Sequence, residues 1–337
     1  MRFIKMEKKI YLYPMRDEAA LKAKSPYVAH LSGALLKHFK IVNYGNNIKG
    51  GILDVTRYFF KANIFYFNWI ENTSVPQICF FFLFFAFAKV FGKKVVWAHH
   101  NVHPHRNNGK LNRYLIKFLA KHANYVVLHT TESLPILQLK QDDKRVVYFF
   151  HPFFASAIGG LPNLPKEYDL LIWGNIRKSK GVDGFMQYLA DNGLLNRYKI
   201  NITGKFESEE LYKRMSAAYG SETITINNKF ISAEEMDMLH AKSRFVFFPY
   251  TGSSVLNSGA LLTSLPKGIP VIGPNVGGFK EMGQLGFIAT YNTPAEVLQY
   301  VDKPAEALLQ NWGTMFPPYF EKHSWSDFGD YLNNKLK

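Results

Sequence analysis

Short apolar runs alternate with longer stretches of helical periodicity along the whole chain. The runs of the first half are rich in β-branched and aromatic residues, which favour strands. They cover residues 8–14, 40–45, 63–70, 93–101, 124–130 and 145–152. Between them, 25–39 predicts a helix with Ser25 as its N-cap and Pro26 in its first turn, and 111–123 is amphipathic. This alternation predicts a parallel sheet with helices on both faces.

The alternation restarts after 161–168, a stretch rich in proline and polar residues that we interpret as a linker. The apolar runs of the second half cover residues 169–176, 198–204, 222–230, 244–250, 269–274 and 286–291. Two such sets predict an α/β protein with two Rossmann-like, doubly wound domains that face a cleft. We predict domains over 1–160 and 161–310, followed by a C-terminal segment, 311–337. Ligands of such sheets bind beyond the carboxyl ends of strands, so binding residues are expected directly after strands.

The composition agrees with a large globular protein. The chain has 337 residues, of which 47% are hydrophobic and 20% are charged, which suits two domains with sizeable cores. Its one cysteine, Cys79, excludes an intrachain disulfide framework and is typical of a reducing compartment. The basic N-terminus is followed by only a short strand-like run, so we do not interpret it as a secretory signal peptide. We therefore expect a cytoplasmic protein.

The formal net charge of +15 predicts an anionic partner, which can be a nucleic acid, a phosphorylated ligand or an anionic membrane surface. The basic residues are scattered along the chain and not gathered in one helix or tail, which argues against nucleic acid. Residues 75–94 are rich in phenylalanine, and their uncharged part is too short to span a bilayer. Two alternatives stay open for this segment. It is a buried helix of the α/β domain, or a helix at the membrane interface with Lys89, Lys93 and Lys94 near lipid phosphates.

A basic loop follows the first apolar run of the second half. It reads GNIRKSKG over 174–181, with Arg177 and Lys180 between a strand end and a helix start. A guanidinium and a flexible ammonium beside a strand end suit a phosphate or a diphosphate. The alternative is an ordinary solvated basic loop.

The stretch from Pro249 to Gly278 is rich in glycine and in hydroxyl side chains, and Lys267 is its one charged residue. It predicts a strand end, a loop, and a helix beginning near Ser258 whose free amides and positive dipole end attract anions. A second helix begins after Gly277 and its neighbouring glycine, which let a ligand approach the backbone closely. We predict a diphosphate site there, with tight turns and ordinary caps as the alternative.

These motifs resemble those of GT-B glycosyltransferases, in particular a subgroup that acts on bacterial surface polysaccharides and lipid-linked sugars. The architecture of the whole chain is similar, but the specific motifs GNIRKSKG, NSGALL, GIPVI and GGFKE all lie between Gly174 and Glu281. The resemblance implies that Arg177 and Lys180 neutralise the diphosphate of a nucleotide-sugar, with no metal and no cofactor. The donor-binding residues expected on this basis are Gly174, Asn257, Ser258, Gly259, Thr263, Gly277, Gly278 and Glu281.

The sequence departs from the largest group of these enzymes at one point. That group has two glutamates, separated by seven residues, which flank the donor. The matching positions here are Val255 and Thr263, and neither is acidic. The resemblance therefore assigns no ribose contact, no donor identity and no stereochemistry. Glu281, after the paired glycines, is the alternative candidate for contact with ribose or sugar.

The richest loop of the first half is 97–106, which directly follows a strand and contains His99, His100, His103 and His105. Four histidines raise the alternative of a zinc site, but no cysteine or carboxylate lies nearby and the resembled fold needs no metal. The family has a strand ending in T-x-H-N, which His100 and Asn101 match. This implies that His100 polarises the donor sugar or takes the acceptor proton. A loop histidine bonded to the backbone is the alternative.

The loop 67–74 follows the preceding strand and offers an aromatic face with polar neighbours, which suits a sugar. Its carboxylate, Glu71, is also an alternative general base. The predicted acceptor-binding residues are Asn68, Trp69, Glu71, Asn101 and His103. In the resembled architecture the C-terminal segment 311–337, rich in aromatic residues, crosses back as a helix to the first domain and clamps the hinge.

We therefore expect a hexosyltransferase that acts in polysaccharide biosynthesis, peripheral on the cytoplasmic face of the membrane. It would move a sugar from a UDP- or GDP-sugar to a hydroxyl of a lipid-linked or polysaccharide acceptor. One alternative is a nucleotide-sugar epimerase on the same fold, which needs acid–base groups on both faces of the sugar. Another is a non-catalytic protein that binds nucleic acid or membranes through its charge. A nicotinamide dehydrogenase is not expected, because no G-x-G-x-x-G follows any predicted strand.

Overall fold

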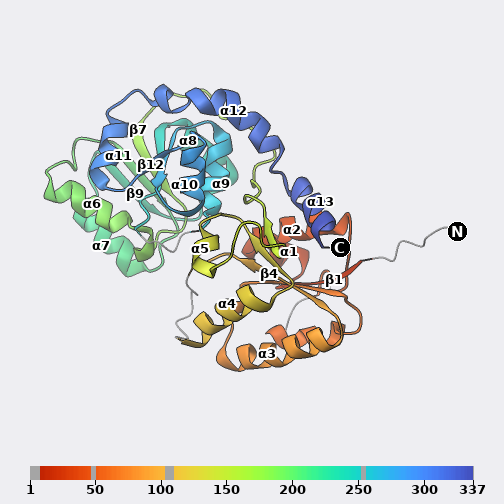
Figure 1. The fold of residues 1–337 in the computed structure, drawn as a ribbon. Helices are drawn as coiled ribbons and strands as arrows, with labels where there is room; N and C mark the ends of the chain where they lie inside the picture. The colour runs from red at the N-terminus through yellow and green to blue at the C-terminus, as the bar shows by residue number, and fades with distance from the viewer. Residues whose placement is uncertain (1–7, 47–50, 103–109, 252–255, 337) are drawn as a thin grey trace. The chain divides into compact units, whose positions relative to one another are not determined.

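The computed structural model describes residues 8–46, 51–102, 110–251 and 256–336. The chain forms two compact units (Figure 1). Unit 1 comprises Met1–Pro152 together with His323–Lys337, and unit 2 comprises Phe153–Lys322. Within the described ranges, each unit contains one six-stranded sheet. The predicted α/β class with two Rossmann-like domains is confirmed.

The sheet of unit 1 has the strand order β2-β1-β3-β4-β5-β6, and all its pairs are parallel. Its strands are β1 (Lys9–Tyr13), β2 (Lys40–Ile41), β3 (Ile64–Asn68), β4 (Lys94–His99), β5 (Tyr125–Leu128) and β6 (Val146–Tyr148). The helices of this unit are α1 (Glu18–Lys24), α2 (Pro26–Leu36), α3 (Val75–Val90), α4 (Lys110–His122), α5 (Ser133–Leu137) and α13 (Trp325–Lys335), with 3-10 turns η1 (Gly51–Tyr58) and η2 (Ile70–Asn72).

Successive side chains of β3 enter two separate cores, one on each face of the unit 1 sheet. Phe65 and Phe67 pack in the core shared with α3 and α4. Ile64 and Tyr66 pack in the core shared with α2 and α13. All five residues of β3 are buried. Because the side chains of 64–67 enter cores on both faces, these positions are all apolar and the sequence reads as an apolar run there.

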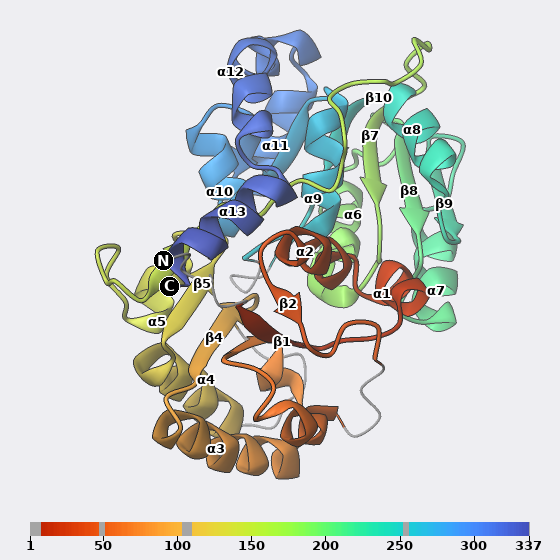
Figure 2. The ribbon, with the colours of Figure 1, turned by 90° about the vertical axis from the view of Figure 1, so that its right-hand side faces the viewer.

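The sheet of unit 2 has the strand order β12-β11-β10-β7-β8-β9, again parallel throughout. Its strands β10, β7, β8 and β9 are seen side by side in Figure 2. Its strands are β7 (Tyr168–Trp173), β8 (Ile200–Gly204), β9 (Ile224–Asn228), β10 (Ser243–Phe247), β11 (Val271–Pro274) and β12 (Ala289–Tyr291). Its helices are α6 (Val182–Asp191), α7 (Glu209–Tyr219), α8 (Ala233–Ala241), α9 (Gly259–Ser264), α10 (Gly277–Gln284), α11 (Pro294–Val301) and α12 (Gln310–Glu321). Short 3-10 turns are η3 (Lys178–Lys180), η4 (Leu265–Lys267) and η5 (Ala305–Leu308).

The C-terminal helix α13 packs on α2 inside unit 1 (Figure 1), which confirms that a C-terminal helix returns to the first domain. Phe328 and Leu332 of α13 are fully buried in the core shared with α2. The two backbones approach closely, because a Cβ on Gly329 would lie 2.7 Å from the carbonyl oxygen of Ala34. Glycine at this position therefore sets the distance between the two helices.

The returning segment begins at His323, later than the predicted residue 311. The reason is that α12 is anchored in unit 2 by its aromatic side chains. The indole Nε1 of Trp312 donates to the carbonyl of Leu265 at 3.0 Å. Phe316 is fully buried. The sequence showed an aromatic segment but not which of its rings belong to which unit.

Unit 2 begins at Phe153, ahead of the stretch 161–168 that we interpreted as the linker. The Phe153 ring lies 5.3 Å from the ring of Phe316, between centroids. The amide of Gly159 donates to the Pro266 carbonyl at 2.8 Å. These contacts tie the segment before β7 to unit 2, although it has no regular secondary structure.

Candidate functional site

The loop after β7 is held firmly at its base. Ile176 is buried and forms an isolated parallel bridge with Phe206. At Gly174, where φ is 106°, the chain passes so close to β8 that a Cβ on Gly204 would lie 1.8 Å from the Gly174 carbonyl oxygen. The backbone is thus fixed while the side chain of Arg177 is exposed to solvent.

The end of this loop lies against the segment that follows β10. Gly181 has a φ of 70°, in the left-handed region that favours glycine. A Cβ at this position would lie 2.0 Å from the carbonyl oxygen of Pro249. Both the backbone conformation and the available space therefore require glycine. The close approach brings Lys180 next to Tyr250.

Tyr250 connects the basic loop to the start of α9. The Nζ of Lys180 donates to the Tyr250 hydroxyl and lies 4.1 Å from the centroid of its ring. The same hydroxyl lies 3.1 Å from the Oγ of Ser258. Ser258 in turn caps α9 by accepting from the amide of Leu261. Because Tyr250 and Ser258 are both buried, this chain of contacts fixes the position of the ammonium.

The start of α10 lies beside the same segment. The amide of Gly278 donates to the carbonyl of Leu256 at 2.7 Å, and Gly277 has a φ of 54°. The N-cap residue of α10 contributes no side-chain hydrogen bond. Phe279, one residue further, packs edge-on against Tyr250 with ring centroids 5.6 Å apart. Tyr250 is therefore a neighbour of the basic loop, of the α9 cap and of the first turn of α10.

The other predicted donor residues take different positions. The side-chain nitrogen of Asn257 is buried and makes no hydrogen bond to any described residue. Gly259 is exposed in the first turn of α9. Thr263 is turned toward its own helix, since its hydroxyl donates to the Gly259 carbonyl at 2.9 Å. Glu281 is buried in the second turn of α10. Asn257 and Gly259 thus flank the Ser258 cap, whereas Thr263 and Glu281 lie in the second turns of α9 and α10.

Sequence reasoning did not single out Tyr250, although it links the predicted motifs. The available signal was a hydroxyl-bearing aromatic residue shortly after the apolar run of β10, at the strand end where ligands of such sheets bind. Its two neighbours in the site, Lys180 and Ser258, were both predicted from their own motifs.

Unit 1 brings together three of the predicted residues: His100, Asn68 and Trp69. His100 Nε2 lies 3.0 Å from Asn68 Oδ1, and Asn68 Nδ2 donates to the Tyr13 carbonyl at 2.9 Å. Because an amide oxygen can only accept, His100 Nε2 carries the imidazole proton and Nδ1 is the acceptor nitrogen. Trp69 stacks on His100 with centroids 4.5 Å apart, and its φ of 50° is unusual for a non-glycine residue.

Three histidines follow three consecutive strands of unit 1 and meet around Tyr27. The Tyr27 ring centroid lies 4.6 Å from His100, 5.5 Å from His129 and 5.3 Å from His151. The Tyr27 hydroxyl donates to His129 Nε2 at 2.8 Å, because His129 Nδ1 donates to the Phe149 carbonyl. Burial lowers the pKa of His129 to about 4 and holds the pKa values of His100 and His151 well below their usual range. All three rings are therefore neutral near neutral pH. The sequence indicated neither Tyr27 nor His129.

Glu71 is separated from this group. It is fully buried, and the indole Nε1 of Trp97 donates to its carboxylate at 3.4 Å. Trp97 faces the core shared with α3 and α4, whereas Trp69 packs against the core of the opposite face. Burial raises the pKa of Glu71 to about 7. A fully buried carboxylate offers no surface to a ligand, so we do not carry Glu71 into the proposed acceptor site.

Of the other candidate residues in the loop 97–106, some have buried side chains and some lie outside the described residues. His99 is fully buried, with Nδ1 3.1 Å from the hydroxyl of Ser133. The side-chain nitrogen of Asn101 is buried and has no hydrogen-bond partner among the described residues. His103 lies outside the described residues, as does His105. Among the residues that the structure does describe, no group of three or more His, Cys, Asp or Glu is placed to hold a metal ion.

Comparison with known proteins finds similarity in structure but not in sequence. No protein-family model matches the chain, and no curated protein sequence matches it. The structure is similar to sucrose-phosphate synthase from Thermosynechococcus elongatus, with a TM-score of 0.70, 12% identity, and coverage of 98% of this chain and 99% of that one. It is also similar to HepE from Anabaena in complex with UDP-glucose, with a TM-score of 0.63 and 11% identity over 98% of this chain and 99% of that one.

A third similar structure is the apo form of the lipopolysaccharide outer core galactosyltransferase WaaB. Its TM-score is 0.62 and its identity 13%, over 98% of this chain and 99% of that one. At such identities a likeness shows the fold and not the activity. Together with the two parallel sheets and the return of α13 to unit 1, these matches establish that the chain has the GT-B fold.

Proposed function

We propose that this protein is a metal-independent glycosyltransferase. It moves a hexosyl group from a UDP- or GDP-sugar to a hydroxyl of a lipid-linked or polysaccharide acceptor. The observation that carries the proposal is the connected set of Lys180, Tyr250 and Ser258, which joins a basic loop to the start of α9. One structure with this fold binds UDP-glucose, and a cation held beside helix amides is what a diphosphate group needs.

In the proposed reaction, the acceptor oxygen forms a bond to the anomeric carbon of the sugar. The bond from that carbon to the diphosphate oxygen breaks, and the diphosphate leaves with the electron pair. Negative charge develops on the leaving group, where Lys180, Arg177 and the backbone amides near Ser258 and Gly278 stabilise it. Because these groups are held in place before the reaction, little reorganisation is needed as the charge develops.

The acceptor hydroxyl loses its proton in this reaction, and we propose that His100 accepts that proton. Its imidazole is neutral because of burial, and its bond to Asn68 leaves Nδ1 as the basic nitrogen. A neutral imidazole with a fixed tautomer is suited to general-base catalysis. Trp69, stacked on His100, offers an aromatic face to the C–H groups of a sugar. Asn101 and His103 complete the proposed acceptor residues.

We further propose that the protein works peripherally on the cytoplasmic face of a membrane, in polysaccharide biosynthesis. Within the described residues, no helix is both long and apolar enough to cross a membrane. The net charge of +15 favours an anionic surface. A lipid-linked acceptor would be reached from such a surface.

A thermal-shift panel of UDP, GDP, dTDP, CMP and NAD tests the proposal. A ligand that binds only the folded state raises the Tm, by an amount equivalent to about 2.7 kcal/mol at one hundred times its Kd. We expect one nucleoside diphosphate to stabilise the protein, and Arg177→Ala to abolish the shift. Lys213→Ala, at another exposed basic residue of unit 2, serves as the control and keeps the shift. Stabilisation by NAD alone, or equal shifts in both variants, would overturn the proposed donor site.

A further inference from the structure

Helix α3 is apolar on both its faces. Its inner face is buried in the core of unit 1 through Ile78, Phe81, Phe84, Phe85 and Ala88. Its outer face is exposed, yet it also carries large apolar side chains: Leu83 is 65% exposed, Phe87 61% and Val90 81%. The one charged side chain of the helix is Lys89. The two alternatives for this segment, a core helix and an interfacial helix, are therefore compatible. The inner face packs in the core, and the outer face is exposed and apolar.

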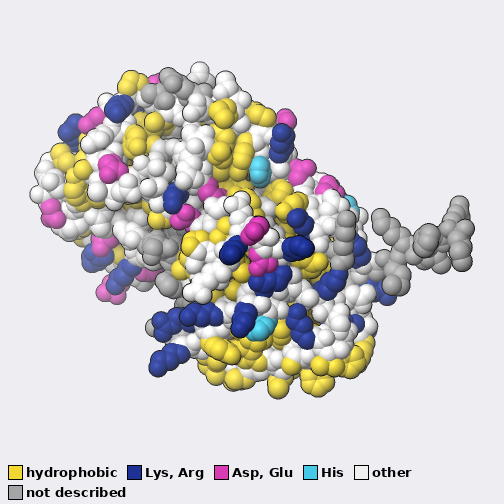
Figure 3. Space-filling model, viewed as in Figure 1, with side chains coloured by type: hydrophobic (Ala, Val, Ile, Leu, Met, Phe, Trp, Pro, Cys, Tyr) yellow, Lys and Arg dark blue, Asp and Glu magenta, His cyan; other side chains and the backbone are white. Residues whose placement is uncertain are grey.

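The exposed apolar surface continues beyond the helix. Phe91 follows α3 and is 52% exposed, and Phe60 is 80% exposed. Their rings lie 5.9 Å apart between centroids. We call the side chains of Leu83, Phe87, Val90, Phe91 and Phe60 the apolar face. A space-filling view shows hydrophobic side chains gathered along the outer edge of α3 (Figure 3). A contiguous patch of this kind on a folded protein marks an interaction surface.

Basic residues of α4 border the apolar face. Neither α3 nor α4 contains an aspartate or a glutamate. The exposed side chains of α4 include four cations, Lys110, Arg113, Lys117 and Lys121. Dark-blue side chains next to the hydrophobic edge are visible in Figure 3. An apolar face bordered by cations and lacking acids is complementary to the interface of an anionic bilayer.

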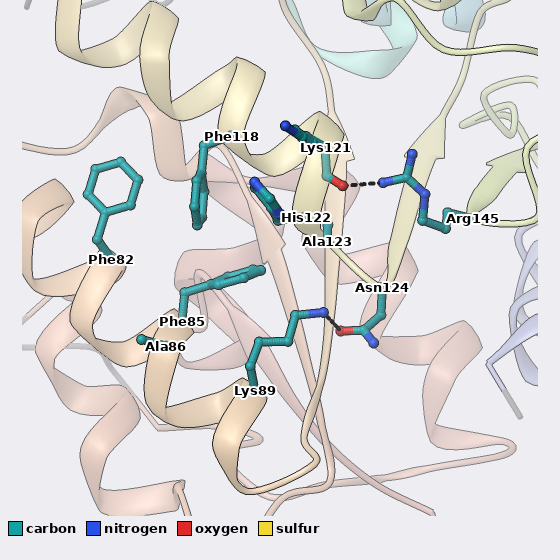
Figure 4. A pocket seen from close by; sticks show the side chains of 10 residues that line it. All are labelled: Phe82, Phe85, Ala86, Lys89, Phe118, Lys121, His122, Ala123, Asn124 and Arg145. Atoms are coloured by element: carbon teal, nitrogen blue, oxygen red, sulfur yellow. Dashed lines mark hydrogen bonds between the residues drawn. The ribbon is translucent and has the colours of Figure 1, made fainter.

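A pocket of about 710 Å³ opens between α3 and α4 at the same surface (Figure 4). The rings of Phe82, Phe85 and Phe118 form one side of it. Lys89 lies on the other side and donates to the Asn124 side chain at 3.0 Å. The Arg145 guanidinium, also on that side, is paired with Asp143 at 2.6 Å. A cavity with aromatic walls and with Lys89 and Lys121 in its lining suits an amphiphile with an anionic head and an apolar tail.

We propose that the surface formed by α3 and α4 docks on an anionic phospholipid bilayer. The apolar face enters the boundary between head groups and acyl chains, and the cations of α4 meet the lipid phosphates. The pocket accepts part of one lipid. Helix α3 lies in the plane of the interface, because it is too short and its inner face too firmly packed in the core to cross the bilayer. The proposal deepens the lipid-linked acceptor of the proposed function, but it does not depend on the donor chemistry.

A second copy of the chain is a less suitable occupant. Pairing two such surfaces would bring together two copies of α4 that carry only positive charge, and like charges at an interface oppose association. The bilayer offers the opposite charge and an apolar interior together. This difference in charge complementarity decides between the two occupants.

Flotation of the full chain with vesicles tests the proposal. We expect binding to vesicles of phosphatidylcholine mixed with phosphatidylglycerol, and about tenfold weaker binding to phosphatidylcholine alone or at high salt. Phe87→Glu should weaken binding to the anionic vesicles about tenfold. The matched control is Phe230→Glu, in unit 2, where the phenylalanine is 80% exposed. That variant should bind as the unmodified protein does.

A second pair of variants tests the charges. Lys117→Glu, on α4, should weaken binding to anionic vesicles, whereas Lys213→Glu, on α7, should not. Equal binding of the two members of either pair, or no binding to any vesicle, would overturn the proposal. So would a dimer in solution that Phe87→Glu dissociates, because a second copy would then cover the face.

The failure of this proposal is distinguishable from failure of the proposed function. The shift in Tm with nucleoside diphosphates measures unit 2 and is recorded without lipid. Phe87→Glu should retain that shift, and a Tm close to that of the unmodified protein shows that the variant is folded. Nucleotide binding without vesicle binding overturns only the docking surface, and vesicle binding without nucleotide binding overturns only the donor site.

Discussion

The ammonium of Lys180 lies 4.1 Å from the ring centroid of Tyr250 and donates to the hydroxyl of that ring. The same hydroxyl lies 3.1 Å from the Oγ of Ser258, at the cap of α9. A flexible lysine side chain is thereby ordered before any ligand arrives. Ordering a rotamer-rich side chain on binding costs about 0.5–1.5 kcal/mol, so prior ordering by Tyr250 favours ligand affinity. Tyr250 is a positioning residue in this account, and Lys180 is the residue that would touch phosphate.

Tyr250→Phe should separate these two roles. The phenyl ring keeps the cation–π contact but removes the hydroxyl that receives Lys180 and faces Ser258. A hydrogen bond to a charged group contributes about 1.5–3 kcal/mol, so we expect the Kd of the nucleoside diphosphate to rise about tenfold. Lys180→Ala should lower kcat/KM by about a hundredfold or more, because it removes charge that acts on the leaving group. Calorimetric titration and initial-rate kinetics measure the two effects. A Tyr250→Phe protein with unchanged Kd would contradict the positioning role.

Gly181→Ala should disturb the same site through the backbone. Its Cβ would lie 2.0 Å from the Pro249 carbonyl oxygen, so the basic loop must move away from Tyr250. Gly193→Ala is the matched control, because Gly193 has a similar φ of 67° but nothing within 4 Å of its added Cβ. Both variants carry the strain of a left-handed alanine, about 1 kcal/mol. We expect only Gly181→Ala to weaken nucleotide binding measurably. Equal Kd values for the nucleoside diphosphate in the two variants would mean that the position of the basic loop does not affect nucleotide binding.

The sequence predicted the framework well, for a physical reason. All strands up to β12 in the described residues overlap apolar runs, because strands of a parallel sheet that pack against cores on both faces are mostly apolar. The positions of Lys180 and Ser258 after strands could likewise be read from local motifs. Their connection through Tyr250 could not, since it depends on contacts between residues far apart in the chain.

Two other features show where sequence reasoning ends. Glu71 stands in a loop after a strand, as an acceptor contact would, but its side chain turns into the core beside Trp97. A single sequence does not reveal which way a loop side chain points. Tyr27 and His129 belong to α2 and to the end of β5, and only the packing of α2 against the sheet brings their side chains together.

Gly329→Ala should destabilise unit 1. The added Cβ would lie 2.7 Å from the Ala34 carbonyl oxygen, so α13 has to move away from α2. Overpacking of this kind costs about 1–3 kcal/mol. Gly184→Ala, within α6, is the control, because nothing lies within 4 Å of its added Cβ and alanine is favoured over glycine in a helix by about 0.5–1 kcal/mol. Thermal unfolding should show a lower Tm for Gly329→Ala and an unchanged or higher Tm for Gly184→Ala. A Gly329→Ala protein as stable as the unmodified chain would contradict the close packing of α13.

The stability of unit 1 should depend on pH through Glu71. Burial raises the pKa of Glu71 from 4.5 to about 7. Between these values the folded protein keeps a proton that the unfolded chain has released, so the free energy of unfolding falls as pH rises from 4.5 to 7 and is level above. The loss amounts to roughly 3 kcal/mol.

The buried histidines act in the opposite direction. Burial lowers the pKa values of His99 and His129 from 6.5 to about 4, so stability falls as pH drops through that interval.

Because these two effects overlap, the test is the difference between the unmodified protein and Glu71→Gln. The histidine contributions cancel in this difference, and the glutamine oxygen can still accept from the indole of Trp97. We expect the variant to gain stability relative to the unmodified protein as pH rises from 4.5 to 7, by roughly 3 kcal/mol in all. Urea unfolding at a series of pH values measures this gain. A difference that stays constant with pH would mean that Glu71 ionises as readily in the folded protein as in the unfolded chain, and that its burial beside Trp97 does not hold the proton.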